Sequence, residues 1–475
     1  MLFNSLVFIF FLLLVVPIYY LISKKKYKHL FLVLSSYFFY GYWDWRFCFL
    51  LLLSTIIDFY IAKGIDRTKD LRKKKYLVTI SLFSNLGILF VFKYFNFFID
   101  SFQSVSSDLG YNLDFLHLNV ILPVGISFYT FQTLSYTIDV YRKKLKHTDN
   151  FIDFALFVSF FPQLVAGPIE RAASLLPQLT KKKKSFSLKQ FKEGIVLIVM
   201  GLFRKVIIGD SSGRYVDQIF GNIENFKSIE ILMALVLFSI QIYADFSGYS
   251  KIARGTAKLL GIELMKNFEQ PYLSTNITEF WRRWHISLSS WLKDYLYFSL
   301  GGNRNGKYNT YKNLMITMLL GGLWHGASWN FVIWGGLHGA YLIIHKLILK
   351  GEKIRNTNVK SFKFSIVLNI IFTYILVLFT WLFFRAPDLN TVRLFFKKII
   401  YWESSEYSLL FTSITFSYII VVVLLDFIEY RKQKHTYILD IKSSGIKLSL
   451  LFTLFLISII YMLQVDPLPF IYFQF

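Results

Sequence analysis

The chain has 475 residues, of which 55% are hydrophobic and 19% aromatic, and its formal net charge is +24. A composition this apolar excludes an ordinary soluble globular protein and indicates a polytopic membrane protein. The single cysteine, Cys48, excludes an internal disulfide framework, a zinc cluster built on cysteines and a CxxC redox pair.

Apolar runs long enough for transmembrane helices recur along the whole chain. A spanning helix needs about 20 mostly apolar residues. No linker, internal repeat or low-complexity tract divides the series, so we expect one integral membrane domain over 1–475 with an all-α polytopic fold. The first run precedes its basic cluster, which indicates a transmembrane helix and not a signal peptide. The predicted spans are 5–23, 28–43, 47–63, 76–99, 119–140, 194–209, 229–247, 309–325, 329–348, 364–384, 408–428 and 447–464.

Lysine and arginine concentrate between these runs, as the positive-inside rule expects of cytoplasmic loops. This pattern accounts for the net charge, and no nucleic-acid-binding module is visible, so we expect no nucleic-acid partner. The loop 100–119 has no lysine or arginine and is predicted to be external. The predicted cytoplasmic loops are 23–29, 63–75, 141–147, 181–192, 349–355 and 429–435.

The apolar stretch 151–166 has basic loops on both sides, so it should enter and leave on the cytoplasmic face. It runs into Pro162, Gly167 and Pro168. A re-entrant or broken segment fits this pattern, because irregular backbone is tolerated at membrane depth inside protein or against a cavity. A proline-kinked helix fits as well, and both interpretations stay open.

A second element that does not span is predicted over 278–298, as an interfacial amphipathic helix. Asn276 begins it as a helix cap, with Glu279 at the third following position. The segment 300–309 is predicted to be a turn rich in glycine and asparagine that closes the element. At 100° per residue, Trp281, Trp284, Leu288, Trp291, Leu292 and Tyr295 share one face, and Arg282, His285, Ser289 and Lys293 share another.

Three of the eight histidines are candidates for function. His325 lies in LLGGLWHGASW (319–329), where an ionisable residue in a membrane segment favours function over packing. The glycines beside it allow close backbone approach and a break in the helix. His285 is expected on a polar helix face. His338 is expected to make a polar packing contact, while His29, His117, His147, His345 and His435 are expected at the surface or at helix ends.

The chemistry open to these histidines is general-base catalysis. No HExxH metal motif and no GxSxG nucleophile motif occurs, so a bound metal is not expected. Histidine titrates near neutral pH, and its neutral imidazole can take a proton from an alcohol that attacks an activated acyl group. Burial favours that neutral form.

Few charged residues interrupt the apolar runs. Asp245 has two interpretations: it binds an ion or substrate hydroxyl, or it caps a following helix, which we slightly favour. Arg204 and Lys205 are expected to pair with Asp210 or Asp245, or to attract an anionic acyl donor.

Several of these segments together resemble the membrane-bound O-acyltransferase (MBOAT) superfamily, and in particular its bacterial branch of alginate O-acetyltransferase-like proteins. The order and spacing of the two histidine motifs make the resemblance specific, and it covers most of the chain. The motifs are FWRRWHISLSSWLKDYLYFSLGGNR (280–304), NLMITMLLGGLWHGASWNFVIWGGLHG (313–339), ILPVGISFYTFQTLSYTIDVYR (121–142), FFPQLVAGPIER (160–171), QIYADFSGYSKIARGTAKLLG (241–261) and PFIYFQF (469–475).

The resemblance implies a ring of transmembrane helices, with re-entrant and interfacial helices around a thinned centre. It implies that His325 is catalytic and that His285 is a second active-site residue. The acyl donor would be a cytoplasmic thioester, either acetyl-CoA or one on a carrier protein, with no tightly bound cofactor. The acceptor would be an extracytoplasmic polysaccharide, and an SGNH-type partner protein would take part in its acetylation. The protein would lie in the bacterial plasma membrane, in contact with membrane lipid.

Two alternatives to polysaccharide O-acetylation remain at this stage. The D-alanyl transfer branch of the superfamily modifies teichoic acid, although WRRWH, LGGNR and the PFIYFQF ending fit the acetyl branch better. A transporter or flippase would use its histidines to relay protons, but it would be expected to show repeats or several intramembrane acid–base groups.

Overall fold

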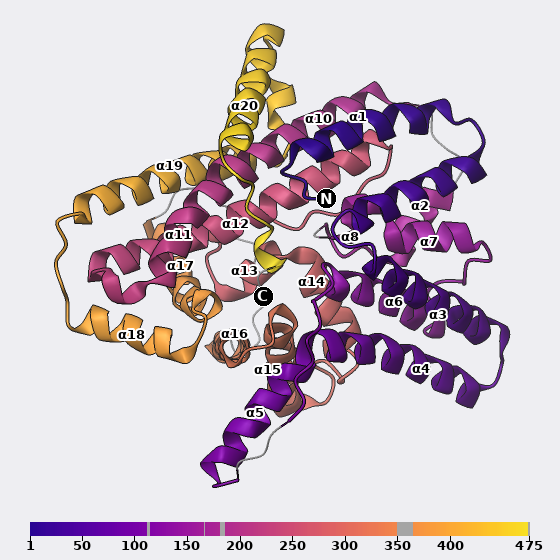
Figure 1. Cartoon of the computed structure of the whole chain (residues 1–475), viewed down its shortest axis with the longest axis horizontal. Coiled ribbons are helices and arrows are strands. Elements are labelled where there is room, and N and C mark those ends of the chain that lie inside the picture. Colours follow the sequence, from indigo (N-terminus) through magenta and orange to yellow (C-terminus); the bar gives the residue numbers. More distant parts are fainter. Residues whose placement is uncertain (112–114, 166, 181–185, 349–363, 474–475) are drawn as a thin grey trace. The chain divides into compact units, whose positions relative to one another are not determined.

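The computed structural model describes residues 1–111, 115–165, 167–180, 186–348 and 364–473. Every regular element in these ranges is a helix (Figure 1), which confirms the all-α fold class. Seven of the described helices are long and apolar enough to cross a membrane. The chain packs as two compact units, Met1–Ile195 with Ala253–Met265 and Val196–Ile252 with Lys266–Phe475. The single domain over 1–475 stays a prediction.

Helices that are neighbours in the chain and helices that are distant in it pack together in the first unit. α3 packs against α4 and α6, and α2 packs against α7. The predicted apolar runs 5–23, 28–43 and 47–63 correspond to the first three of these helices. The elements are α1 (Leu6–Leu21), α2 (Lys25–Gly41), α3 (Phe47–Arg67), α4 (Leu71–Leu89), α5 (Phe95–Asp108), α6 (Ile126–Tyr141), α7 (Phe151–Ser159), α8 (Phe161–Leu164), α9 (Ala172–Thr180) and the start of α10 (Leu188–Leu202).

The stretch 151–166 is broken, as one of the two interpretations required. α7 ends at Ser159, Phe160 takes a non-helical conformation, and the short α8 begins directly after it with Pro162 in its first turn. Both helices are buried in protein. The backbone break is therefore sheltered from lipid, which is the condition under which irregular backbone persists at membrane depth.

The predicted loop 100–119 is helical in its first part, while its external position stays a prediction. Helix continues from Leu71 to Asp108 over 38 residues. It ends where Gly110 adopts a left-handed φ of 85° and its amide donates to Ser107 O at 2.9 Å. A glycine just past the last turn is a common helix stop. The polar residues before it are compatible with helix, so polarity alone predicted the boundary too early.

The second unit contains the histidine motifs. α12 lies partly in each unit, and α15 and α16 pack side by side (Figure 1), with α17 against α16. The elements are a π-helical segment at Phe203–Asp210, α11 (Ser211–Gly221), α12 (Ser228–Leu259), α13 (Ile277–Arg283), α14 (Ile286–Trp291), a second π-helical segment at Leu292–Tyr297, α15 (Gly306–His325), α16 (Trp329–Ile348), α17 (Phe364–Arg385), α18 (Leu389–Ile400), α19 (Ser408–Lys432) and α20 (Ser444–Gln464).

Glycines allow α15 and α16 to approach at backbone distance. A Cβ atom on Gly322 would lie 2.1 Å from Phe331 O, and one on Gly335 would lie 2.3 Å from Met318 O. Neither position tolerates a side chain without movement of the neighbouring backbone. The expected role of the glycine run before His325 in close packing is thereby confirmed, and it fixes the end of α15 beside α16.

We predict that Gly335→Ala destabilises the protein by about 1–3 kcal/mol, because the added methyl group overlaps backbone and forces the two helices apart. Gly336→Ala is the matched control. It lies one residue along the same helix, and its Cβ would make an ordinary 3.5 Å contact with Leu319. Thermal unfolding in one detergent measures both. Equal midpoints for the two variants would show that the close contact does not limit stability.

Candidate active site

His285 occupies a break between two short helices. α13 ends at Arg283, α14 begins at Ile286, and His285 has left-handed backbone angles, φ 41° and ψ 56°. Asn267 supports this break, since its carbonyl accepts from the Ile286 amide at 2.9 Å and its side chain accepts from the Ser287 amide at 3.2 Å. The continuous helix predicted over 278–298 is therefore wrong. Left-handed backbone at a non-glycine residue is strained, and such strain clusters at functional sites.

The break turns His285 inward. Its side chain is fully buried, so the predicted position on a polar helix face is also wrong. The imidazole lies 4.5 Å from the ring of Phe246, 5.9 Å from Trp324 and 6.3 Å from Tyr472, measured between centroids. Burial lowers the pKa of His285 to about 3, so the ring is neutral at physiological pH. Nε2 has no hydrogen-bond partner among the described residues.

His325 is the last residue of α15 and is 2% exposed. Four aromatic rings surround it. Their centroids lie 5.0 Å away for Trp324, 4.9 Å for Trp334, 5.2 Å for Phe384 and 5.3 Å for Tyr472. Gly326 follows in an extended conformation and ends the helix. The helix therefore ends beside the histidine, as the neighbouring glycines predicted.

The two histidines share two aromatic neighbours. Trp324 and Tyr472 each contact both imidazole rings, so the residues that the two histidine motifs supply meet in one aromatic cage. A catalytic role for either histidine stays a prediction. The cage excludes bulk water around groups that can exchange a proton, which is the arrangement that acid–base chemistry on an acyl group requires.

Tyr472 is a site residue that reasoning from the sequence missed. It comes from the short 3-10 turn Ile471–Phe473 near the end of the chain, and its hydroxyl is buried with no hydrogen-bond partner in the described part of the molecule. The ending PFIYFQF was noted only as a family resemblance. No periodicity links it to a histidine almost 150 positions earlier, so local pattern could not place it.

Asp245 holds this C-terminal segment in place. Its Oδ2 accepts from the Ile471 amide at 2.9 Å, and its Oδ1 lies 2.9 Å from Lys205 Nζ. Lys205 also pairs with Asp210 at 2.5 Å, which confirms the predicted partners of this lysine. The capping role that we favoured for Asp245 is wrong, because α12 continues without interruption from Ser228 to Leu259.

Arg204 pairs with carboxylates that were not predicted. Its guanidinium lies 2.7 Å from Asp426 and 3.3 Å from Glu429, both on α19. Glu429 also pairs with Lys251. This network is buried. Arg204 is thus occupied by internal partners, which leaves the attraction of an anionic donor without support at this residue.

Among the remaining histidines, one has the predicted packing role and two do not lie at the predicted surface. His338 accepts from Trp281 Nε1 at 3.3 Å and lies 2.9 Å from Thr380 Oγ1, which confirms its packing role. The predicted surface position is wrong for His29 and His435, which are buried. His29 bonds to Asp153 at 2.6 Å. Within the described ranges, no three histidine, cysteine or acidic residues gather where they could hold a metal ion.

The chain matches the model of the membrane-bound O-acyltransferase family over residues 34–386. It is 41% identical over 396 residues to a probable alginate O-acetylase of Pseudomonas syringae pv. tomato, covering 82% of this chain and 73% of the relative. It is 35% identical to the peptidoglycan O-acetyltransferase of Helicobacter pylori, covering 82% of this chain and 78% of that relative. It is 28% identical to the teichoic acid D-alanyltransferase of Bacillus subtilis, covering 57% of this chain and 71% of that relative.

The fold and these matches define a multi-pass membrane acyltransferase. The chain belongs to the membrane-bound O-acyltransferase family and resembles its alginate O-acetylase-like branch. Membership of this family favours acyl transfer over the transporter alternative.

We predict that Asp245→Ala releases the C-terminal segment and destabilises the protein by about 3–5 kcal/mol, because it breaks a buried ion pair. Hydrogen–deuterium exchange of peptides covering 466–473, together with thermal unfolding, measures both effects. Glu403→Ala is the control, since it removes an exposed ion pair with Lys227 and should change neither readout. Unchanged exchange in Asp245→Ala would contradict the anchoring role.

Proposed function

We propose that this chain is a membrane O-acetyltransferase that moves an acetyl group from a cytoplasmic thioester towards an extracytoplasmic polysaccharide. The observation that carries the proposal is the aromatic cage, in which His285 and His325 contact the same two rings. The names of the relatives, an alginate O-acetylase and a peptidoglycan O-acetyltransferase, support both the acetyl group and a polysaccharide acceptor.

His325 is the proposed general base. The acceptor hydroxyl oxygen attacks the thioester carbonyl carbon, and the imidazole takes the hydroxyl proton as the new C–O bond forms. The C–S bond then breaks, and the proton passes from the imidazolium to the departing thiolate. His325 returns to its neutral form, so atoms and charge balance without a further reactant.

His285 is the proposed substrate-orienting residue. Its pKa of about 3 makes it a neutral hydrogen-bonding group and a poor proton store at neutral pH. Its buried Nε2, with no partner among the described residues, is available to a substrate polar group. The surrounding rings exclude water, which protects a thioester from hydrolysis while the acceptor is in place.

The donor, the partner and the location belong to the same proposal. The donor is acetyl-CoA or an acetylated carrier protein, and the acceptor is reached through an SGNH-type protein outside the bacterial plasma membrane. D-alanyl transfer to teichoic acid is the second candidate, since a D-alanyltransferase is among the relatives at 28% identity. Chemical analysis of the isolated polymer separates the two, because one attaches acetyl esters and the other attaches D-alanyl esters.

We predict that His325→Ala lowers polymer O-acetylation by about a hundredfold or more, the range expected when a general base is removed. His345→Ala is the control, because His345 bonds to Thr278 at 2.8 Å outside the aromatic cage. Acetyl content of the exported polymer is measured at matched protein levels. Normal acetylation in His325→Ala would rule out the proposed base, while loss of acetyl groups with export intact supports it.

We predict that Tyr472→Phe lowers the turnover rate about tenfold without changing the thermal unfolding midpoint, because it removes one hydrogen bond to substrate and keeps the ring. Tyr374→Phe is the matched control, since its hydroxyl is occupied by Ser239 at 2.7 Å. Equal rates for the two variants would assign Tyr472 to packing alone.

A further inference from the structure

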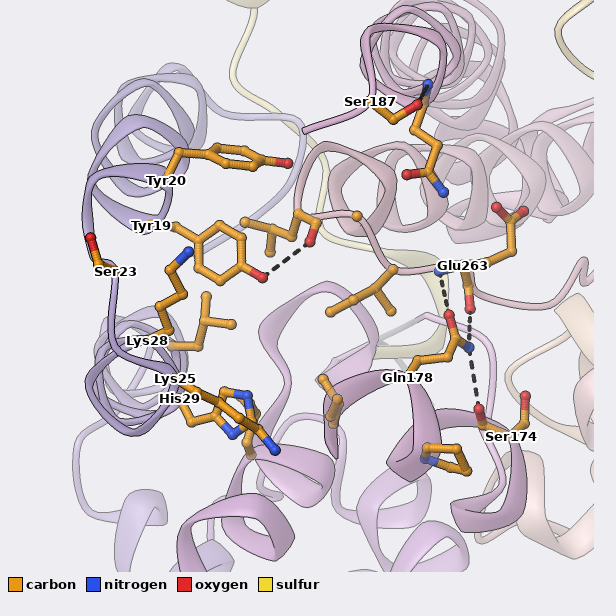
Figure 2. Close-up of a pocket in the computed structure, with 18 residues that line it drawn as sticks. Tyr19, Tyr20, Ser23, Lys25, Lys28, His29, Ser174, Gln178, Ser187 and Glu263 are labelled. Carbon is orange, nitrogen blue, oxygen red and sulfur yellow. Dashed lines mark hydrogen bonds between the residues drawn. The ribbon is translucent and has the colours of Figure 1, made fainter. Parts of the chain in front are cut away.

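A cavity of about 480 Å³ lies within the first unit, away from the histidine motifs in the sequence. Its wall is formed by the end of α1, the start of α2, α9, the start of α10 and the residues 260–263 (Figure 2). Cavities of about 300–1,000 Å³ hold small molecules and cofactors in many proteins. The proposed acetyl transfer uses none of the residues that line this one.

Two lysines give the wall an uncompensated positive charge. Lys28 is buried and packs its ammonium group 5.2 Å from the Tyr19 ring centroid. Lys25 donates to Thr180 O, a neutral acceptor. Neither ammonium pairs with a carboxylate among the described residues, although a buried charge without a counter-ion is costly. An anionic ligand would supply that counter-ion.

The other ionisable groups in the wall already have partners. His29 bonds to Asp153 at 2.6 Å, and Glu263 pairs with Lys258 at 2.5 Å. Gln178 is also occupied, since it bonds to both the amide and the carbonyl of Glu263. The charge offered to a ligand therefore comes from Lys25 and Lys28, and Glu263 does not cancel it.

The backbone adds to this positive potential. α2 begins at Lys25, and its N-cap residue Lys24 makes no side-chain capping bond. The first amides of a helix and the positive end of its dipole favour negatively charged groups, phosphate above all. Ser23 lines the cavity at the same end of the helix. Ammonium groups, a hydroxyl and a helix start together form the surroundings that phosphates commonly have in proteins.

We propose that this cavity binds the phosphate group of an anionic ligand, with Lys28 and Lys25 as its cationic contacts. Two sources carry this chemistry: the headgroup of an anionic phospholipid, and a soluble phosphate-bearing molecule of the coenzyme A type. The basic segment 23–29, which includes the start of α2, is predicted to be cytoplasmic, and on that side basic pockets meet both anionic lipid and soluble nucleotides.

The test uses the full chain in two binding experiments. In one, the protein is reconstituted in phosphatidylcholine nanodiscs with added phosphatidylglycerol, and retained lipid is counted by native mass spectrometry. In the other, coenzyme A is titrated into the detergent-purified protein by calorimetry. The variants are Lys28→Gln and Lys25→Gln. Lys26→Gln is the matched control, because Lys26 is exposed on the same helix and does not line the cavity.

In each cavity variant we expect either about a tenfold loss of retained phosphatidylglycerol or about a tenfold rise in the dissociation constant of coenzyme A, while both readouts stay within about twofold in Lys26→Gln. A change confined to phosphatidylglycerol identifies a lipid headgroup, and one confined to coenzyme A identifies a soluble ligand. Binding that is the same in all variants and in both experiments would overturn the proposal.

Folding defects are separated from loss of binding by two further variants. Lys28→Arg keeps the charge and should retain binding, whereas Lys25→Gln alters an exposed side chain and should leave the unfolding midpoint unchanged. Loss of binding in Lys28→Arg with normal binding in Lys25→Gln would also overturn the proposal. None of these readouts measures acyl transfer. Coenzyme A that binds equally well in all variants would belong to the proposed catalytic site, and only binding that depends on Lys25 and Lys28 belongs to this cavity.

Discussion

The buried ion pair between Lys205 and Asp245 is the interaction on which the second unit depends. It joins the π-helical segment Phe203–Asp210, the middle of α12 and, through the Ile471 amide, the C-terminal residues. Lys205 Nζ also lies 3.3 Å from Leu468 O. A buried charge is costly unless it is paired and hydrogen-bonded. The need to satisfy Lys205 and Asp245 together therefore brings the chain end to the cage around His285 and His325.

Small residues make that pairing possible. A Cβ atom on Gly248 would lie 2.7 Å from Gly201 O, and one on Gly209 would lie 3.0 Å from the Asp245 amide nitrogen. Glycine at these positions lets the π-helical segment lie directly against α12, as small residues do between membrane helices. The π-helical geometry is itself an irregularity that often occurs at functional sites. Close packing and the ion pair therefore support each other.

The sequence predicted what local pattern can encode. The predicted spans include all seven described helices that are long and apolar enough to cross a membrane, although twelve spans were predicted. Pro162 pointed to the break near Phe160, and Asn276 was correctly expected to begin a helix, where its side chain accepts from the Glu279 amide. Each of these features depends on neighbours within a few residues.

The errors concern partners that are distant in the chain. Helical periodicity over 278–298 could not predict the left-handed turn at His285, because Asn267, which supports the turn, lies outside that segment. Asp245 looked like a cap because its local context resembles one, but its partners are Lys205 and the Ile471 amide. Tyr472 lacked any signal other than family resemblance. Tertiary contacts decided all three.

Three buried histidines of the second unit, His285, His325 and His338, show how packing and chemistry can be told apart. His338 has both ring nitrogens engaged, with Trp281 and with Thr380, so its hydrogen-bonding capacity is spent inside the protein. His285 is equally buried, yet its Nε2 has no partner among the described residues. Leaving a buried polar atom unpaired costs about 1–3 kcal/mol. His285 also has a strained backbone and lies beside the cage that encloses His325. A polar group that is kept unpaired to bind substrate would show this combination of strain and unsatisfied hydrogen bonding.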